Sequence, residues 1–103
     1  MEAIIKEERC PVEAVAEIIG RKWVSLILRD LAQGPQRFGQ LEHSIGVSPR
    51  ILSQRLQELE TEGLISRQVF AEVPPRTEYA LTERGRLLSP LVETMREVGK
   101  HFI

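Results

Sequence analysis

The stretch "FGQLEHSIGVSPRILSQRLQELETEG", from Phe38 to Gly63, decides the fold of this chain. Its pattern predicts a short helix from about Phe38 to Ser44 and then a tight turn at Gly46-Val47. Ser48-Pro49 predicts a strong helix start, because a hydroxyl cap is followed by proline at the first helical position. The helix that follows carries one leucine stripe and stops at Gly63. Two helices joined by a short turn that contains glycine predict a helix-turn-helix.

The residues directly after this unit alternate like two strands, Leu64 to Phe70 and Thr77 to Leu81, and predict a β-hairpin. Pro74 and Pro75 stiffen its tip, which lowers the entropy cost of ordering it. A hairpin directly behind a helix-turn-helix predicts a winged helix. Arg76 would then reach a DNA phosphate or a narrow minor groove. An ordinary hairpin loop with an exposed arginine is an equally good interpretation of the local sequence.

Two helices are predicted before this unit and one after it. Pro11 begins the first, with Cys10 as its cap. The second, from about Lys22 to Gln33, is apolar around much of its girth, which predicts a central helix with Trp23 in the core. Thr82 caps the last helix, which Pro90 should kink or restart. The predicted fold class is α+β, mainly α: a single winged helix-turn-helix domain over residues 1–103 with a two-stranded wing.

Composition narrows the function classes. The chain has 103 residues, 42% hydrophobic and 28% charged, which indicates one ordered domain rather than two domains or a disordered chain. No apolar run reaches transmembrane length and the N-terminus lacks the order of a signal peptide, so we expect a cytoplasmic protein without a membrane partner. The one cysteine and two histidines form no ligand-spaced cluster, so neither a metal nor another cofactor is expected.

The charge distribution is more informative than the net charge of −1. Between Leu31 and Gln57 the bases are Arg37, Arg50 and Arg55, and the only acid is Glu42. Acidic residues gather elsewhere. One basic region could therefore face a polyanion while the rest of the surface stays acidic.

The helix that starts at Pro49 carries a polar sector opposite its leucines Leu52, Leu56 and Leu59. Arginine, glutamine and serine are side chains that read base edges, so this sector is a candidate DNA-reading face. A solvated surface, as on any exposed helix, is the alternative, and so is a winged-helix protein-interaction module that does not bind DNA. The candidate DNA-binding residues are Arg37, Ser48, Arg50, Ser53, Gln54, Gln57 and Arg76.

Three segments carry a resemblance to a known family: "CPVEAVAEIIGRKW", "LILRDLAQGPQRFGQLEHSIGVSPRILSQRLQELETEGLISR" and "VPPRTEYALTERGRLLSP". Together they resemble the HxlR-type family of bacterial winged helix-turn-helix regulators, from Cys10 to about Gly99. The resemblance implies a transcriptional regulator, a repressor or an activator, that binds double-stranded DNA as a homodimer at a pseudo-palindromic operator. It also implies that the first and last helices form the dimer. The helix that starts at Pro49 would be the recognition helix, and the two recognition helices of the dimer would enter successive major grooves.

The residues agree with a dimer, because the last helix has more apolar surface than so small a domain can cover alone. The alternative is that this helix packs only on its own subunit. The candidate interface residues are Val12, Leu88, Leu91, Val92, Met95 and Phe102.

Cys10 and Arg21 each have two interpretations. Some proteins that resemble this family sense oxidants or electrophiles through a cysteine at the position of Cys10, which makes it a candidate redox sensor for an oxidant or small-molecule effector. It would otherwise be a helix cap that packs as a small apolar residue. Arg21 and Lys22 begin a helix whose dipole repels cations, so they either contact a phosphate or are an ordinary solvated pair. No general base stands near Cys10, so a thiol enzyme is not expected.

Overall fold

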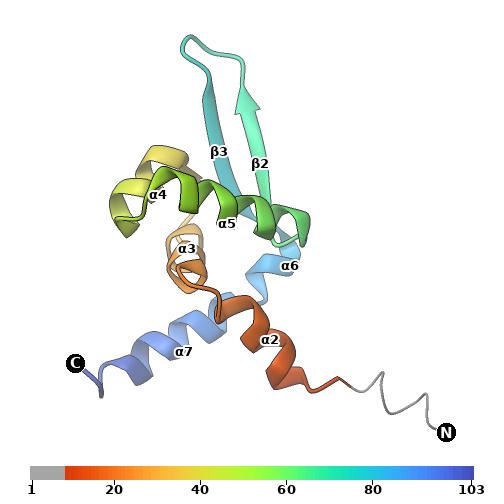
Figure 1. Ribbon diagram of the computed structural model, residues 1–103, viewed down its shortest axis with the longest axis vertical. Helices are drawn as coiled ribbons and strands as arrows, with labels where there is room; N and C mark the ends of the chain where they lie inside the picture. The colour runs from red at the N-terminus through yellow and green to blue at the C-terminus, as the bar shows by residue number, and fades with distance from the viewer. Residues whose placement is uncertain (1–8) are drawn as a thin grey trace, which may run out of the picture.

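A computed structural model describes residues 9–103 and confirms the predicted winged helix-turn-helix, mainly helical with a small antiparallel sheet (Figure 1). The elements are α2 (Pro11–Ile19), α3 (Val24–Leu31), β1 (Gln36–Arg37), α4 (Phe38–Ile45), α5 (Pro49–Thr61), β2 (Ile65–Phe70), β3 (Arg76–Leu81), α6 (Glu83–Arg86) and α7 (Ser89–Gly99).

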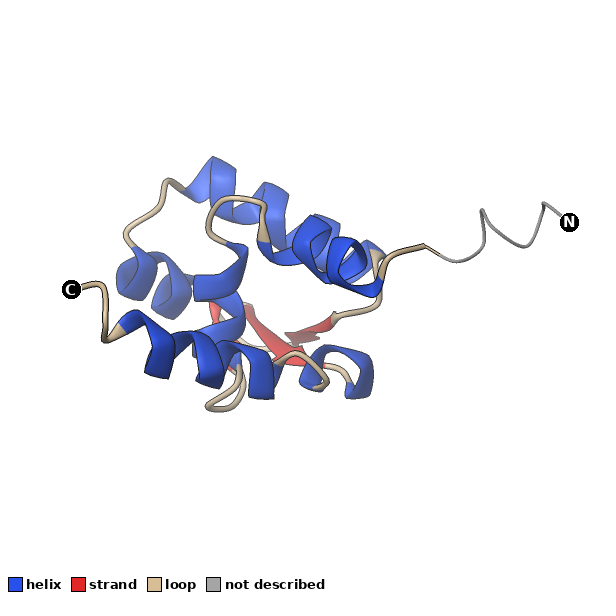
Figure 2. Cartoon of the chain, turned by 90° about the horizontal axis from the view of Figure 1, so that it is seen from below, coloured by secondary structure: helices blue, strands red, loops and turns tan. Residues whose placement is uncertain are grey.

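The elements are arranged around α3. In Figure 1, α4 and α5 lie on one side of α3, while α2 and α7 lie on the opposite side. The wing of β2 and β3 extends away from all the helices, so that its tip is the point farthest from α2 and α7. Figure 2 shows the same chain from below, with the helices gathered around the small sheet. The helix-turn-helix and the wing therefore share one end of the molecule.

The core is built mainly from α3 and from one face each of α4, α5 and α7. Leu52, Leu56 and Leu59 of α5 are at most 1% exposed, as their spacing predicts. They lie beside the start of the wing and share one core with the apolar residues of α3, which fill its centre. The other core members are Val24, Ile27, Leu28, Leu31, Leu41, Val47, Leu64, Ile65, Tyr79, Leu81, Leu88 and Val92.

The turn of the helix-turn-helix forms as expected. Gly46 has a φ of 75°, which glycine adopts without strain, and it ends α4. The Ser48 hydroxyl oxygen accepts the backbone N–H of Ile51 at 3.3 Å, which caps α5. These two local devices fix where α5 begins and hence which of its residues face outward.

The start of the central helix and the number of strands differ from expectation. The central helix begins at Val24 rather than Lys22, because Trp23 has a left-handed φ of 79° and only its carbonyl enters the helix, accepting the N–H of Ile27 at 3.0 Å. Trp23 is therefore half-buried against the core rather than enclosed in it. The strand β1 was not predicted, since two residues show no period; it pairs with β3, giving the order β1-β3-β2.

The last helical segment is divided in two. The helix α6 ends at Arg86, and α7 restarts with Pro90 in its first turn. The restart is one of the two outcomes predicted for Pro90, since proline suits a first turn but not a helix interior. Within residues 9–103 there is no helix with the length and apolar character needed to cross a membrane.

Candidate nucleic-acid interface

The outer face of α5 is exposed and polar. Arg50, Ser53, Gln54 and Gln57 are all exposed, while the leucines of the same helix are buried. None of these four side chains makes a hydrogen bond or an ion pair with any residue in the range 9–103. Their donors and acceptors are thus available to a ligand.

Arg55, on the same helix, shows the contrast. Its Nε donates to the carbonyl oxygen of Lys22 at 3.1 Å, and its guanidinium lies 3.5 Å from a Glu58 carboxylate oxygen. Arg55 therefore holds α5 to the segment before α3. The basic residues of α5 divide into one structural arginine and one, Arg50, that is available.

The start of α4 lies beside the wing. Arg37 is exposed, and its backbone N–H donates to the Gln40 side-chain oxygen at 2.7 Å, which satisfies one of the free N–H groups of the first turn. A groove of about 390 Å³ separates this turn from the wing tip and has Arg37 on one wall and Arg76 on the other. Arg37 could face a phosphate backbone from its wall, whereas the Arg76 guanidinium on the other wall is already paired with carboxylates.

Arg76 is not at the free tip of the wing. It is the first residue of β3 and pairs across the hairpin with Phe70. Its guanidinium lies 2.8 Å from Glu72 and 2.6 Å from Glu78, and 3.9 Å from the centroid of the Phe70 ring. Its Nε is buried and has no partner within residues 9–103. Arg76 thus stiffens the base of the tip in this conformation.

Sequence reasoning missed this clamp around Arg76. The signal was present, because Glu78 stands two residues along the same strand and therefore on the same face. Glu72 stands four residues before Arg76, across the tip. Only the fold of the tip brings Glu72 back onto the guanidinium. The contact with Glu78 could therefore be predicted from the sequence, whereas the contact with Glu72 could not.

Arg21 makes an ion-pair network rather than standing free. Its guanidinium donates to Glu62 at 2.7 and 2.9 Å and to Glu58 at 3.2 Å. The hydrogen bond to Glu62 is the main reason that the pKa of Arg21 is raised above its ordinary value. Neither interpretation of Arg21 anticipated this, because its partners lie 37 and 41 residues away. The network joins the loop after α2 to the end of α5.

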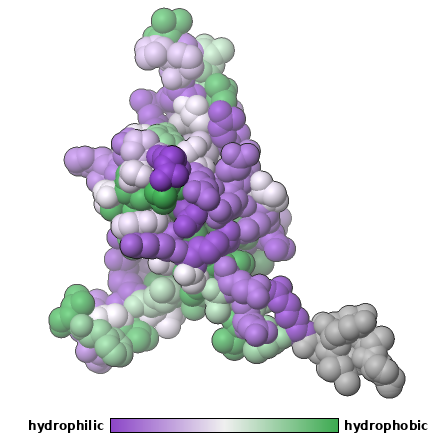
Figure 3. Space-filling model, in the orientation of Figure 1, coloured by the Kyte–Doolittle hydropathy of each residue, from purple (hydrophilic) through white to green (hydrophobic). Residues whose placement is uncertain are grey.

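The residues predicted to form the dimer interface are exposed only in part. Leu88 and Val92 were expected at a dimer seam, but each is 8% exposed and belongs to the core of its own chain, because this side of α7 faces α3. Leu91 is half-buried. Val12, Met95 and Phe102 remain 76%, 40% and 81% exposed. Figure 3 shows apolar surface gathered over the C-terminal end of the chain.

Cys10 is exposed and occupies the cap position of α2, but its side chain makes no capping hydrogen bond. Its carbonyl oxygen accepts the backbone N–H of Ala14 at 3.0 Å, and its side chain does not belong to the core of its own chain. Lys6, Glu7 and Glu8, which stand shortly before Cys10 in the sequence, lie outside the described residues. Among residues 9–103 there is no group of acidic, histidine or cysteine side chains arranged to hold a metal ion.

The comparisons with known proteins agree with this geometry. The family model described as "HxlR-like helix-turn-helix" matches residues 18–103. A relative from Bacillus subtilis, described as the uncharacterised HTH-type transcriptional regulator YvaP, is 43% identical over 95% of this chain and 93% of its own length.

Solved structures also match this chain. One is the redox regulator HypR in its oxidised form, at a TM-score of 0.82 and 39% identity over 89% of this chain and 96% of that one. Another is the reduced transcriptional regulator YodB from B. subtilis, at a TM-score of 0.77 and 34% identity over 91% of this chain and 94% of that one. The chain belongs to the HxlR-like helix-turn-helix family, a family of regulators rather than enzymes, and is a DNA-binding transcriptional regulator.

Proposed function

We propose that the protein acts in the cytoplasm as a homodimer, without catalysis, and that it binds a pseudo-palindromic operator through α5. The observation that carries this proposal is the outer face of α5, where four exposed polar side chains have no partner within the described residues. Arg50 would contact guanine, and Gln54 and Gln57 would contact adenine, because these pairings match donors and acceptors in the major groove. Ser53 would contact either base.

The contacts to phosphate would come from the elements around α5. Arg37 lies on the groove between α4 and the wing, where it would anchor one strand. The exposed residue Ser48 would lie near the same backbone while its hydroxyl caps α5. Arg76 would have to exchange Glu72 for a phosphate, so its contribution depends on a rearrangement at the wing tip. Such contacts set register and affinity rather than sequence preference.

Arg50→Ala and Gln54→Ala are each expected to weaken operator binding by about 1–3 kcal/mol, because each removes a contact to a base edge. Thermal stability should stay nearly unchanged, since both side chains are exposed and unpaired within residues 9–103. Fluorescence anisotropy with operator and scrambled duplexes measures both affinities. The control is Gln33→Ala, an exposed glutamine in the turn after α3. Operator affinities equal to that of the control would remove α5 from the DNA interface.

We also propose that Cys10 makes the regulator responsive to oxidants or electrophiles. Its exposure and its lack of a capping hydrogen bond support this, because a sensor thiol must be reachable. A solved relative at 39% identity is described as a redox regulator. Cys10 opens α2, which also carries the exposed Val12 of the proposed dimer interface. An added group at the thiol would therefore change the spacing of the two recognition helices.

Treatment with a quinone is expected to change the operator affinity of the wild type and to leave that of Cys10→Ser unchanged. The thiolate would add covalently to the quinone ring, placing a bulky group at the start of α2. Mass spectrometry confirms the adduct, and a gel-shift titration measures the affinity. If wild-type protein that carries the adduct binds the operator with unchanged affinity, Cys10 is not a sensor.

A further inference from the structure

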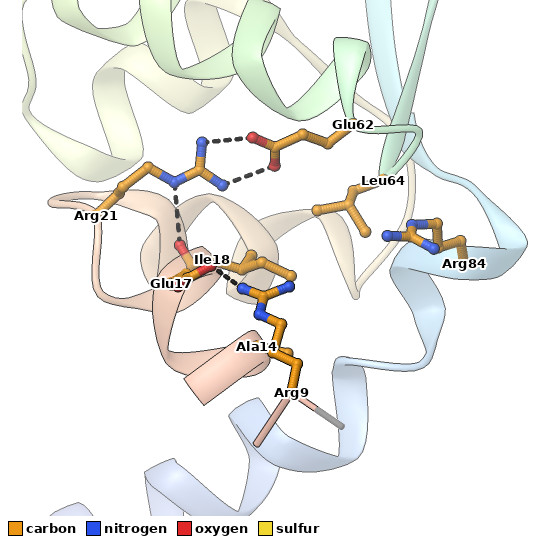
Figure 4. Close-up of a pocket in the computed structure, with 8 residues that line it drawn as sticks. All are labelled: Arg9, Ala14, Glu17, Ile18, Arg21, Glu62, Leu64 and Arg84. Carbon is orange, nitrogen blue, oxygen red and sulfur yellow. Dashed lines mark hydrogen bonds and ion pairs between the residues drawn. The ribbon is translucent and has the colours of Figure 1, made fainter. Parts of the chain in front are cut away.

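We propose that the cavity between α2, the end of α5 and α6 binds a small organic carboxylate with an apolar body. The cavity measures about 440 Å³, which lies within the range of about 300–1,000 Å³ that is usual for small-molecule sites. Figure 4 shows it with its lining residues, which come from both the dimerising half and the DNA-binding half of the chain.

The charges of the cavity select a monoanion. Three guanidinium groups line it, and two are already neutralised: Arg9 pairs with Glu17, and Arg21 pairs with Glu62. Arg84 is exposed, and its side chain makes no ion pair or hydrogen bond within residues 9–103. Its side chain reaches toward the cavity beside Leu64, as Figure 4 shows. One available guanidinium suits one carboxylate, while Glu17 and Glu62 on the walls disfavour a dianion such as phosphate.

The remaining walls are apolar. Ala14 and Ile18 present one side of α2 to the cavity, and both are only partly buried. Leu64 forms the opposite wall, at the start of the wing. A ring or a short alkyl chain in the cavity would bury apolar surface mainly on the α2 side, because Leu64 is only 2% exposed and already belongs to the core. The site therefore combines one charged anchor with an apolar slot, which is the composition typical of small-molecule pockets.

The position of the cavity links it to DNA binding. Ala14 and Ile18 belong to α2, whereas Glu62 ends α5 and Leu64 leads into the wing. The ion pair between Arg21 and Glu62 lines the same cavity. A ligand that contacts both sides would shift α2 relative to α5. This consequence rests on the proposed function, whereas the binding site itself does not.

The site is tested by titrating the protein with sodium benzoate, sodium hexanoate and the neutral benzyl alcohol, followed by amide chemical shifts. Both carboxylates are expected to bind saturably, with the largest shifts at Ala14 and Leu64, and benzyl alcohol more weakly. Arg84→Gln is expected to weaken benzoate binding about tenfold, through loss of a charge-assisted hydrogen bond. The control, Arg86→Gln, removes an arginine from the same helix outside the cavity and should bind benzoate like the wild type.

No saturable binding of either carboxylate, or equal binding by Arg84→Gln, would overturn the site. The titration contains no DNA, so its result tests ligand binding independently of the proposed binding to an operator. The link to α5 is tested by repeating an operator titration with saturating benzoate. Operator affinity should change in the wild type and stay constant in Arg84→Gln, and an unchanged wild-type affinity would overturn the link.

Discussion

Replacing Gly85 with alanine is expected to lower the free energy of unfolding by about 3 kcal/mol or more, a large share of the stability of a small domain. A Cβ atom at Gly85 would clash with the carbonyl oxygen of Leu64 and lie 3.0 Å from its carbonyl carbon and 3.3 Å from Leu81 Cδ2. The Leu64 oxygen also accepts the backbone N–H of Thr82 at 3.1 Å. Relief of the clash would require backbone movement in a closely packed region, which is costly.

Urea unfolding followed by circular dichroism measures this effect. The midpoint urea concentration should fall, while the dependence of the unfolding free energy on urea concentration (the m-value) should stay constant. The control is Gly39→Ala, because a Cβ at Gly39 in α4 meets no heavy atom within 4 Å. That variant should be as stable as the wild type, or more stable by up to about 1 kcal/mol, since alanine favours helix. If Gly85→Ala matched Gly39→Ala, α6 could move away from the start of the wing without loss, and the tight contact would be unimportant.

Met95→Glu is expected to dissociate the proposed homodimer while leaving the subunit folded. Met95 is 40% exposed in the single chain, so a glutamate there remains solvated and costs the subunit little. In a dimer it would be an unpaired charge in an apolar contact, at a cost of about 3 kcal/mol or more, or over a hundredfold in the dimer dissociation constant. Operator affinity should fall with it, because two half-sites would no longer be held together.

Analytical ultracentrifugation over a range of concentrations measures the dimer constant, and circular dichroism shows whether the subunit is folded. Met95→Leu is the matched control, since it conserves volume and apolar character. Leu91→Glu is less suitable, because Leu91 is half-buried against its own core and its loss would also unfold the subunit. A folded Met95→Glu protein that sediments as a dimer would place the interface elsewhere.

The fold could be predicted because its signals are local. The Gly46 turn, the Ser48-Pro49 start and the leucine spacing of α5 each act within a few residues. The same spacing placed Arg50 and Gln54 on the exposed face, since the leucines decide which side of α5 is buried.

What sequence reasoning missed depends on contacts between distant residues. The partners of Arg21 lie at the end of α5, and β1 exists only because β3 passes beside it. Leu88 and Val92 read as part of one apolar stripe with Met95 and Phe102. Periodicity identifies such a stripe, but only the position of α3 decides which of its residues are covered by the chain itself.

Hydroxyl-radical footprinting of the purified protein on the DNA that flanks its own gene tests the central proposal most directly. If the protein binds as a dimer with one α5 in each of two successive major grooves, two protected regions should appear on one face of the duplex. Their centres should lie about 34 Å apart, one helical turn. The protection should be lost in Arg50→Ala, Gln54→Ala double-variant protein that is still folded. No protection at any concentration, or a footprint that this double variant leaves intact, would contradict the assignment of α5 as the element that reads DNA.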